Sequence, residues 1–328
     1  MDAGPTDRSV LLWHVHGSWT AAFVQGRHRY LLPVNASRDA DGLGLAGRSW
    51  PRAAEVTAQE LRDIDVDLVV LQRPHELEKA TELLGRRPGV DVPAVYVEHN
   101  APRPSAAESV HPMADQQRIT IVHVTAFNQL MWDNGVAPTE VIDHGVDDPG
   151  FLYTGEVAAA ATMINEPVRR RRIVGTDLLP ALSCVAPVDV WGIGTQALND
   201  GAHRVAGVTG RGDLAHAELL GQVASRRVYV HTARWTSLGL SLIEAMFLGM
   251  PVVCVGSTMA PLVVPEQAGV VSADITELVD GLRGFIEDPQ AAATAGKAAR
   301  EFALAHFSLE RFLAEWDGLM DALCAGKD

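Results

Sequence analysis

The sequence predicts an α/β protein made of two doubly wound, Rossmann-like domains. Short apolar runs alternate with helical segments through short turns in both halves of the chain, which is the pattern of parallel sheets. Polar clusters stand directly after several of these runs, at the edge where such sheets bind ligands. The 328 residues, 47% of them apolar, are enough to build two domains of ordinary size.

The first half of the chain contains apolar runs that predict buried strands at residues 9–15, 30–34, 68–71, 94–97, 119–124 and 139–142. Thr57 and Glu60 have the spacing of a capping box, which opens a short helix. Two further helices are expected at 75–84 and 127–134. The segment 38–51 is rich in glycine, aspartate and arginine and predicts a mobile loop.

Four polar clusters follow predicted strands: Gly17-Ser18, Gln72-Arg73, Glu98-His99-Asn100 and Thr125. Because the carboxyl ends of parallel strands meet at one edge of a sheet, we expect these clusters near a ligand. The residues predicted on the side of an acceptor are His16, Ser18, Gln72 and Thr125. Gly17 would let a donor phosphate approach the backbone closely. Ordinary turns between strands and helices are the alternative. His14 and His16 have no further ligands at a suitable spacing, so no metal site is predicted.

The second half begins with a linker of small residues at 155–161 that leads into a strand at 160–164. Further strands are expected at 188–191, 228–231 and 252–255, and helices at 214–225, 275–287, 290–306 and 308–323. Four consecutive arginines, Arg169 to Arg172, follow the first strand of this half. A charge run is usually a solvated loop, whereas guanidinium groups also form paired contacts with phosphate oxygens. Both interpretations stay open at this point.

The stretch 236–253 carries the clearest pattern in the chain. It predicts a turn, a short helix that contains Glu244, an end of that helix at Gly249 and Pro251, and a strand. The N–H groups of Ser237, Leu238, Gly239 and Leu240 would point from the helix N-terminus toward a phosphate. Glu244, about one to two turns further on, would reach sugar hydroxyls of the same ligand. An ordinary turn of a parallel sheet gives the same pattern.

This stretch resembles the donor-binding motif of retaining glycosyltransferases of family four, the glycosyl transferases group 1. The matching residues are Gly239, Leu240, Glu244, Ala245, Met246, Gly249, Pro251 and Val252. The sequence departs from the motif at Thr236, where the family has a glutamate, and at Ser237 and Leu238. The resemblance implies a GT-B fold, in which two Rossmann-like domains face a cleft and the last helix crosses back to the first domain. The domains would span 1–150 and 151–308, and that helix 309–328.

The resemblance also implies the catalytic residues, His99 and Glu244. His99 follows a strand, where the family has a histidine near the reacting sugar, although a histidine that only caps the strand end is the alternative. Asp143 to Asp147 resembles the turn between the two domains. Trp316 would anchor the last helix on the first domain.

Donor-binding residues follow from the same resemblance. Arg169 takes the position of an arginine that contacts the donor phosphates. Val174 stands where the family has a lysine, so Arg171 or Arg172 would substitute for it. The nucleoside would lie near Val208, Thr209, Gly210 and Glu244. Cations at these positions would neutralise the leaving diphosphate, so neither a cofactor nor a metal is expected.

Composition excludes several other classes of partner. The formal net charge of −14 argues against nucleic-acid binding and allows at most peripheral contact with a membrane. The three cysteines, Cys184, Cys254 and Cys324, are scattered and predict reduced thiols. No signal peptide and no membrane-spanning run is recognisable, so a cytoplasmic location is expected.

The function expected from the sequence is therefore the transfer of a sugar from a UDP- or GDP-linked donor to an acceptor hydroxyl, with retention of configuration. The acceptor would be a small molecule, a saccharide or a lipid. One alternative is a sugar-nucleotide 2-epimerase on the same fold. Another is an inactive partner of a transferase, because Thr236 and Val174 replace two functional residues of the family.

Overall fold

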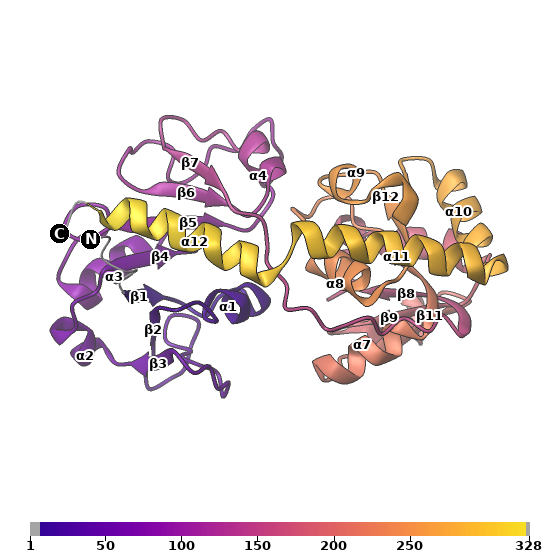
Figure 1. Ribbon diagram of the computed structural model, residues 1–328, viewed down its shortest axis with the longest axis horizontal. Helices are drawn as coiled ribbons and strands as arrows, with labels where there is room; N and C mark the ends of the chain where they lie inside the picture. The colour runs from indigo at the N-terminus through magenta and orange to yellow at the C-terminus, as the bar shows by residue number, and fades with distance from the viewer. Residues whose placement is uncertain (1–6, 326–328) are drawn as a thin grey trace. The chain divides into compact units, whose positions relative to one another are not determined.

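The computed structural model describes residues 7–325, which form two compact units, each built around a parallel sheet (Figure 1). Unit 1 comprises the chain up to Gly145 together with the segment from Leu309 onward, and unit 2 comprises Val146–Ser308. Residues 1–6, on which the absence of a signal peptide was predicted, and residues 326–328 lie outside the described residues. The α/β class and the two Rossmann-like sheets predicted from the sequence are confirmed.

Unit 1 contains a seven-stranded parallel sheet in the order β3-β2-β1-β4-β5-β6-β7. Its strands are β1 (Ser9–Leu12), β2 (Arg29–Pro33), β3 (Ala53–Val56), β4 (Leu68–Leu71), β5 (Ala94–Glu98), β6 (Thr120–His123) and β7 (Thr139–Val141). Its helices are α1 (Gly17–Phe23), α2 (Ala58–Asp63), α3 (Glu76–Leu84), α4 (Ala126–Met131) and α12 (Leu309–Cys324). The strand order reverses between β1 and β4, and ligands bind at such a switch point in doubly wound sheets.

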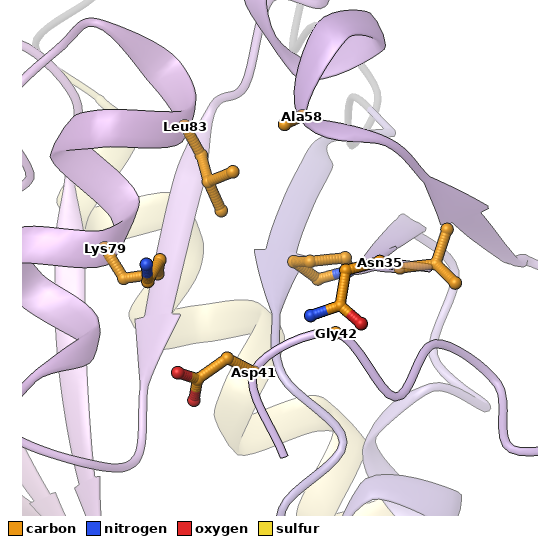
Figure 2. Close-up of a pocket in the computed structure, with 8 residues that line it drawn as sticks. Asn35, Asp41, Gly42, Ala58, Lys79 and Leu83 are labelled. Atoms are coloured by element: carbon orange, nitrogen blue, oxygen red, sulfur yellow. The ribbon is translucent and has the colours of Figure 1, made fainter. Parts of the chain in front are cut away.

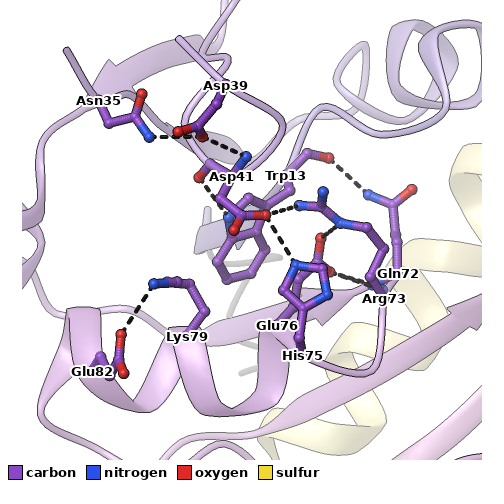
Figure 3. A network of polar contacts seen from close by, with 10 residues as sticks. All are labelled: Trp13, Asn35, Asp39, Asp41, Gln72, Arg73, His75, Glu76, Lys79 and Glu82. Carbon is purple, nitrogen blue, oxygen red and sulfur yellow. Dashed lines mark hydrogen bonds and ion pairs between the residues drawn. The ribbon is translucent and has the colours of Figure 1, made fainter. Parts of the chain in front are cut away.

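The segment 38–51, predicted as a mobile loop, forms polar contacts with other parts of unit 1 (Figure 3). The side chain of Arg38 forms two hydrogen bonds with Glu55, of 2.7 and 2.8 Å. Trp13 Nε1 donates a hydrogen bond of 3.1 Å to the carbonyl of Asp41, whose carboxylate in turn pairs with Arg73 at 3.1 Å. These contacts come from residues distant in sequence, so the polar composition of the segment did not predict them.

Helix α12 packs into unit 1 and completes its core, as Figure 1 shows for the yellow helix beside β5. Trp316 is 1% exposed and contacts Trp19 and Phe23 edge to face, with ring centroids 5.8 and 5.0 Å apart. Arg27 also pairs with Asp317 on the outer side of the helix, at 2.8 Å. The predicted return of the last helix to the first domain, anchored by Trp316, is therefore confirmed.

Unit 2 contains a six-stranded parallel sheet in the order β10-β9-β8-β11-β12-β13. Its strands are β8 (Val157–Met163), β9 (Val188–Trp191), β10 (Val208–Gly212), β11 (Arg226–His231), β12 (Val252–Val255) and β13 (Gly269–Ser272). Its main helices are α5 (Arg171–Val174), α6 (Leu179–Ser183), α7 (His216–Ala224), α8 (Leu240–Leu248), α9 (Ala260–Val263), α10 (Ile275–Glu287) and α11 (Pro289–His306). No helix within residues 7–325 is both long and apolar enough to cross a bilayer.

Candidate functional site

Two segments of unit 2 that are far apart in sequence meet beyond the carboxyl ends of β8 and β11. Thr232 Oγ1 donates a hydrogen bond of 2.7 Å to the carbonyl of Val174, and the N–H of Arg234 donates one of 2.8 Å to the carbonyl of Ile173. Gly175 has a φ of +73°, and a Cβ there would lie 1.9 Å from the carbonyl oxygen of Thr232. The arginine run and the stretch that leads into α8 therefore belong to one region.

Replacing Gly175 with alanine is expected to lower the free energy of unfolding by at least about 2 kcal/mol. The left-handed backbone and the clash with Thr232 both disfavour a side chain. Gly221→Ala is the matched control, because Gly221 lies inside α7 with open space around it and alanine favours a helix by about 0.5–1 kcal/mol. Urea unfolding of both variants measures the difference. Equal effects of the two substitutions would contradict the close contact between the segments.

The arginines of the run have different surroundings. Arg169 forms an ion pair with Glu166 and is 70% exposed, and Arg172 pairs with Asp177 at 2.7 Å. Arg171 is exposed at the start of α5. The structure brings a further positively charged side chain, Arg234, to this region, which the sequence did not suggest. Two nitrogens of Arg234 donate hydrogen bonds of 2.7 and 3.1 Å to the carboxylate of Asp177.

Asp177 therefore joins Arg172 and Arg234. Burial tends to raise the pKa of Asp177, but the hydrogen bonds and the charge of Arg234 lower it overall, so the carboxylate stays ionised. Arg234 NH1 also donates a hydrogen bond of 3.1 Å to the carbonyl of Arg172. The position of Arg234 just after β11 was the only signal available in the sequence, and no motif marked it.

The N-terminus of α8 is closely packed. Ser237 and Leu238 are buried, Gly239 is the N-cap and Leu240 is the first residue of the helix. A Cβ on Gly239 would lie 2.5 Å from Cε1 of His231, so the glycine is required by the imidazole ring beside it. Burial lowers the pKa of His231 to about 4, so this ring is neutral. The helix ends at Gly249 with a φ of +85°, and β12 follows, as the sequence predicted.

Glu244 stands out in unit 2 because its side chain is half-buried and its carboxyl group has no partner among the described residues. Burial raises the pKa of Glu244 to about 7. We find no hydrogen bond or ion pair of this carboxyl group with any residue in the described range. Thr236 Oγ1 is buried and also lacks a hydrogen-bond partner among the described residues. A titratable group perturbed in this way is typical of a binding or catalytic site.

In unit 1 the structure brings together three of the predicted residues, His16, Gln72 and His99. His99 follows β5, and its Nε2 lies 3.0 Å from Oε1 of Gln72. The rings of His16 and His99 stack with centroids 3.9 Å apart, and Trp19 contacts His99 edge to face. Burial, followed by the charges of His16 and His144, holds the pKa of His99 well below its usual range.

The other predicted residues of unit 1, Gly17, Ser18 and Thr125, lie at the starts of helices. Gly17 and the exposed Ser18 form the start of α1, directly after His16. The buried His144 lies close enough to shift the pKa of His99, and sequence patterns gave no sign of this. Thr125 is fully buried, and its Oγ1 accepts a hydrogen bond of 3.1 Å from the N–H of Asn128. Thr125 therefore caps α4, and its predicted contact with an acceptor stays a prediction.

Three of the predicted nucleoside residues, Val208, Thr209 and Gly210, lie on β10, an edge strand of the sheet of unit 2. Val208 is buried and Thr209 is exposed. The N–H of Gly210 donates to Asn199 Oδ1 at 2.7 Å, and its carbonyl accepts from Asn199 Nδ2 at 2.9 Å. Both main-chain groups of Gly210 thus bind Asn199, and the predicted contact of Gly210 with a base stays a prediction.

A small pocket in unit 1 lies at the carboxyl end of β2 and measures about 170 Å³ (Figure 2). Its polar residues are Asn35, Asp41 and Lys79, and its apolar wall comes from Pro33, Val34, Ala58 and Leu83. The charged groups already have partners in the protein, since Lys79 pairs with Glu82 at 3.2 Å and Asp41 with His75 at 2.9 Å. None of the predicted site residues lines this pocket.

A comparison with protein families finds a match within unit 2. The model of the family described as Glycosyl transferases group 1 matches residues 201–302, which include strand β10 and helix α8 with Glu244. The resemblance to this family is confirmed. Val174, which we predicted at the position of the family's lysine, lies outside the matched residues; it is 6% exposed and packs in the core of unit 2. A comparison with curated proteins found no significant match.

Solved glycosyltransferase structures share the fold of the chain. Sucrose-phosphate synthase from Thermosynechococcus elongatus has a TM-score of 0.74 at 14% identity, over 98% of this chain and 100% of that protein. Anabaena HepE in complex with UDP has a TM-score of 0.71 at 17% identity, over 96% and 100%. A glycosyltransferase from Rickettsia africae gives 0.67 at 12% identity, over 97% and 99%. The GT-B fold predicted from the sequence is confirmed.

Proposed function

We propose that the protein transfers a sugar from a nucleoside diphosphate sugar to an acceptor hydroxyl, with retention of configuration. The observation that carries this proposal is Glu244, a half-buried carboxyl group without a partner in the described chain, whose pKa burial raises to about 7. It lies in the helix that matches the donor motif of the glycosyl transferases group 1. HepE, which has the same fold, was solved with UDP and with UDP-glucose, which favours UDP as the nucleotide.

The donor would lie on unit 2, with its diphosphate between the arginine run and the start of α8. Guanidinium groups form paired hydrogen bonds with phosphate oxygens, and a helix N-terminus adds N–H donors. Arg172 and Arg234 are already oriented by Asp177, so they would meet the diphosphate with little reorganisation. Glu244 would accept hydrogen bonds from the ribose hydroxyls. Stabilising the negative charge of the departing diphosphate is the main electrostatic task of the reaction.

The acceptor would lie on unit 1, where His16, Gln72 and His99 meet. The resemblance to the family further suggests His99 as a residue that contacts the reacting sugar. The shallow pocket beside Asp41 is a second surface for the distal part of a small-molecule, saccharide or lipid acceptor. The arginines would supply positive charge to offset the negative charge of the leaving diphosphate.

The proposed function is tested by incubating the protein with UDP-glucose or GDP-mannose, with and without a panel of alcohols and oligosaccharides. We expect UDP or GDP release that depends on an acceptor, and an α-configured product by proton NMR. Release of a free epimerised sugar nucleotide without an acceptor would favour the epimerase instead. No turnover with either donor, together with no nucleotide binding, would contradict an enzymatic function.

Replacing Arg234 with methionine is expected to weaken UDP binding about tenfold, because one charge-assisted contact with the diphosphate is lost. Arg211→Met is the matched control, since Arg211 is also paired with a carboxylate in unit 2, Asp189, at 2.8 Å but lies on β10. Isothermal titration with UDP measures both variants. If Arg234→Met binds UDP as tightly as Arg211→Met does, Arg234 does not contact the phosphates.

A further inference from the structure

A chain of hydrogen bonds in unit 1 links the backbone of Trp13 to the ring of His99 through Gln72. Gln72 Nε2 donates a hydrogen bond of 2.8 Å to the carbonyl of Trp13, a contact drawn in Figure 3. The other end of the amide, Oε1, lies 3.0 Å from His99 Nε2. The N–H of Gln72 donates to the buried carboxylate of Glu76 at 2.6 Å, so the backbone of Gln72 is held as well.

This arrangement determines which nitrogen of His99 carries the proton. A carbonyl oxygen only accepts hydrogen bonds, so the amide nitrogen of Gln72 must face Trp13 and the amide oxygen must face His99. That oxygen also only accepts, so Nε2 of His99 must be the donor. In a neutral imidazole with a proton on Nε2, the other nitrogen, Nδ1, keeps its lone pair and accepts hydrogen bonds.

We propose that Gln72 is a positioning residue that holds His99 in the Nε2–H tautomer, so that Nδ1 accepts a hydrogen bond from an uncharged hydroxyl of the substrate. The assignment of that hydroxyl to a sugar rests on the proposed function, whereas the tautomer itself follows from the contacts of Gln72. A lone pair repels an anionic oxygen, so a phosphate or a carboxylate does not occupy this position. The group recognised beside His99 is therefore a neutral hydrogen-bond donor, which in a sugar is a hydroxyl.

The surroundings of His99 keep its ring neutral. His16 stacks on it and Trp19 contacts its edge, while burial and the nearby His16 and His144 all lower its pKa. The charged side chains near His99 change the pKa of the neighbouring histidines, His16 and His144. Glu98 and Arg73 act on His16 in opposite directions, and Arg311 lowers the pKa of His144 further. In the described part of the chain we find no hydrogen bond to His99 Nδ1, which leaves this nitrogen for a ligand.

The test is the nitrogen-15 NMR spectrum of the histidine rings of the full-length protein, with His99 assigned through the variant His99→Gln. At pH 7.5 we expect wild-type His99 to show a protonated Nε2 and an unprotonated Nδ1. In Gln72→Met, which keeps the length of the side chain but removes the amide, we expect a mixture of the two tautomers. With UDP-glucose as donor, kcat of Gln72→Met should fall about fivefold, as for the loss of one hydrogen bond, with KM for the donor little changed.

Gln25→Met is the control, because the amide of Gln25 also donates to a backbone carbonyl of unit 1, that of Ala21, but contacts no histidine in the described chain. It should leave the His99 spectrum unchanged. A wild-type His99 protonated on Nδ1 overturns the proposal even if Gln72→Met does not fold, and so does an unaltered His99 spectrum in a folded Gln72→Met. The NMR spectrum does not depend on enzyme activity. If His99 has the Nε2–H tautomer but the protein transfers no sugar, the proposed function is overturned and the role of Gln72 is not.

Discussion

Replacing Glu244 with glutamine is expected to stabilise the protein at pH 8 and to weaken its binding of UDP. The pKa of Glu244 is about 7 in the folded protein against 4.5 for the free side chain, so the folded state binds an extra proton between these values. Stability that depends on this group is therefore lost as the pH rises from 4.5 to 7, and it stays lost above pH 7. At pH 8 the cost is at most about 3 kcal/mol, which the uncharged glutamine avoids.

Binding should change in the opposite direction, because glutamine is a weaker acceptor for ribose hydroxyls than a carboxylate. We expect UDP affinity to fall about tenfold or more in Glu244→Gln at pH 8. Glu301→Gln, on the exposed side of α11 in the same unit, is the matched control and should change neither property. Urea unfolding at pH 5 and pH 8, with isothermal titration at pH 8, measures both effects. A stability gain that is the same at both pH values would argue against an ionised, half-buried Glu244.

Replacing Trp316 with alanine is expected to destabilise unit 1 by about 3–5 kcal/mol. The indole is fully buried between Trp19, Phe23 and Phe312, and its removal leaves a cavity that the surrounding rings cannot fill. Because the protein has two units, the transition of unit 1 is followed separately, by hydrogen exchange of its strands in increasing urea. Leu304→Ala, at a half-exposed position of α11, is the control and should cost little. A loss below about 1 kcal/mol for Trp316→Ala would mean that α12 does not complete the core.

Most of the fold could be predicted because its local signals agree with its tertiary structure. The capping box at Thr57 forms as its sequence predicts, and the strands 68–71, 188–191 and 252–255 have the predicted bounds. Strand β3 was missed, because the sequence Ala53–Val56 contains no strongly apolar run. Residues 53–56 form a strand because they pair with the edge of β2, and this pairing depends on the tertiary structure.

The candidate site could be predicted only where a motif or a strand end marked it. Glu244 was found from the spacing of its helix, and His99 from its place after β5. Arg234 and His144 were missed, because their contacts depend on how distant segments pack. The capping role of Thr125 was also missed, although a threonine after a strand suits the N-cap of the following helix, and Thr125 caps α4 here.

The most direct test of the donor site is isothermal titration of UDP into the wild-type protein at pH 7 in two buffers with different enthalpies of ionisation. If Glu244 binds the ribose as a carboxylate, ligand binding lowers its pKa from about 7, and protons are released to the buffer. We predict one UDP site, a binding enthalpy that depends on the buffer, and loss of that dependence in Glu244→Gln. Absence of binding by UDP, GDP and dTDP would contradict a nucleotide-sugar site in unit 2.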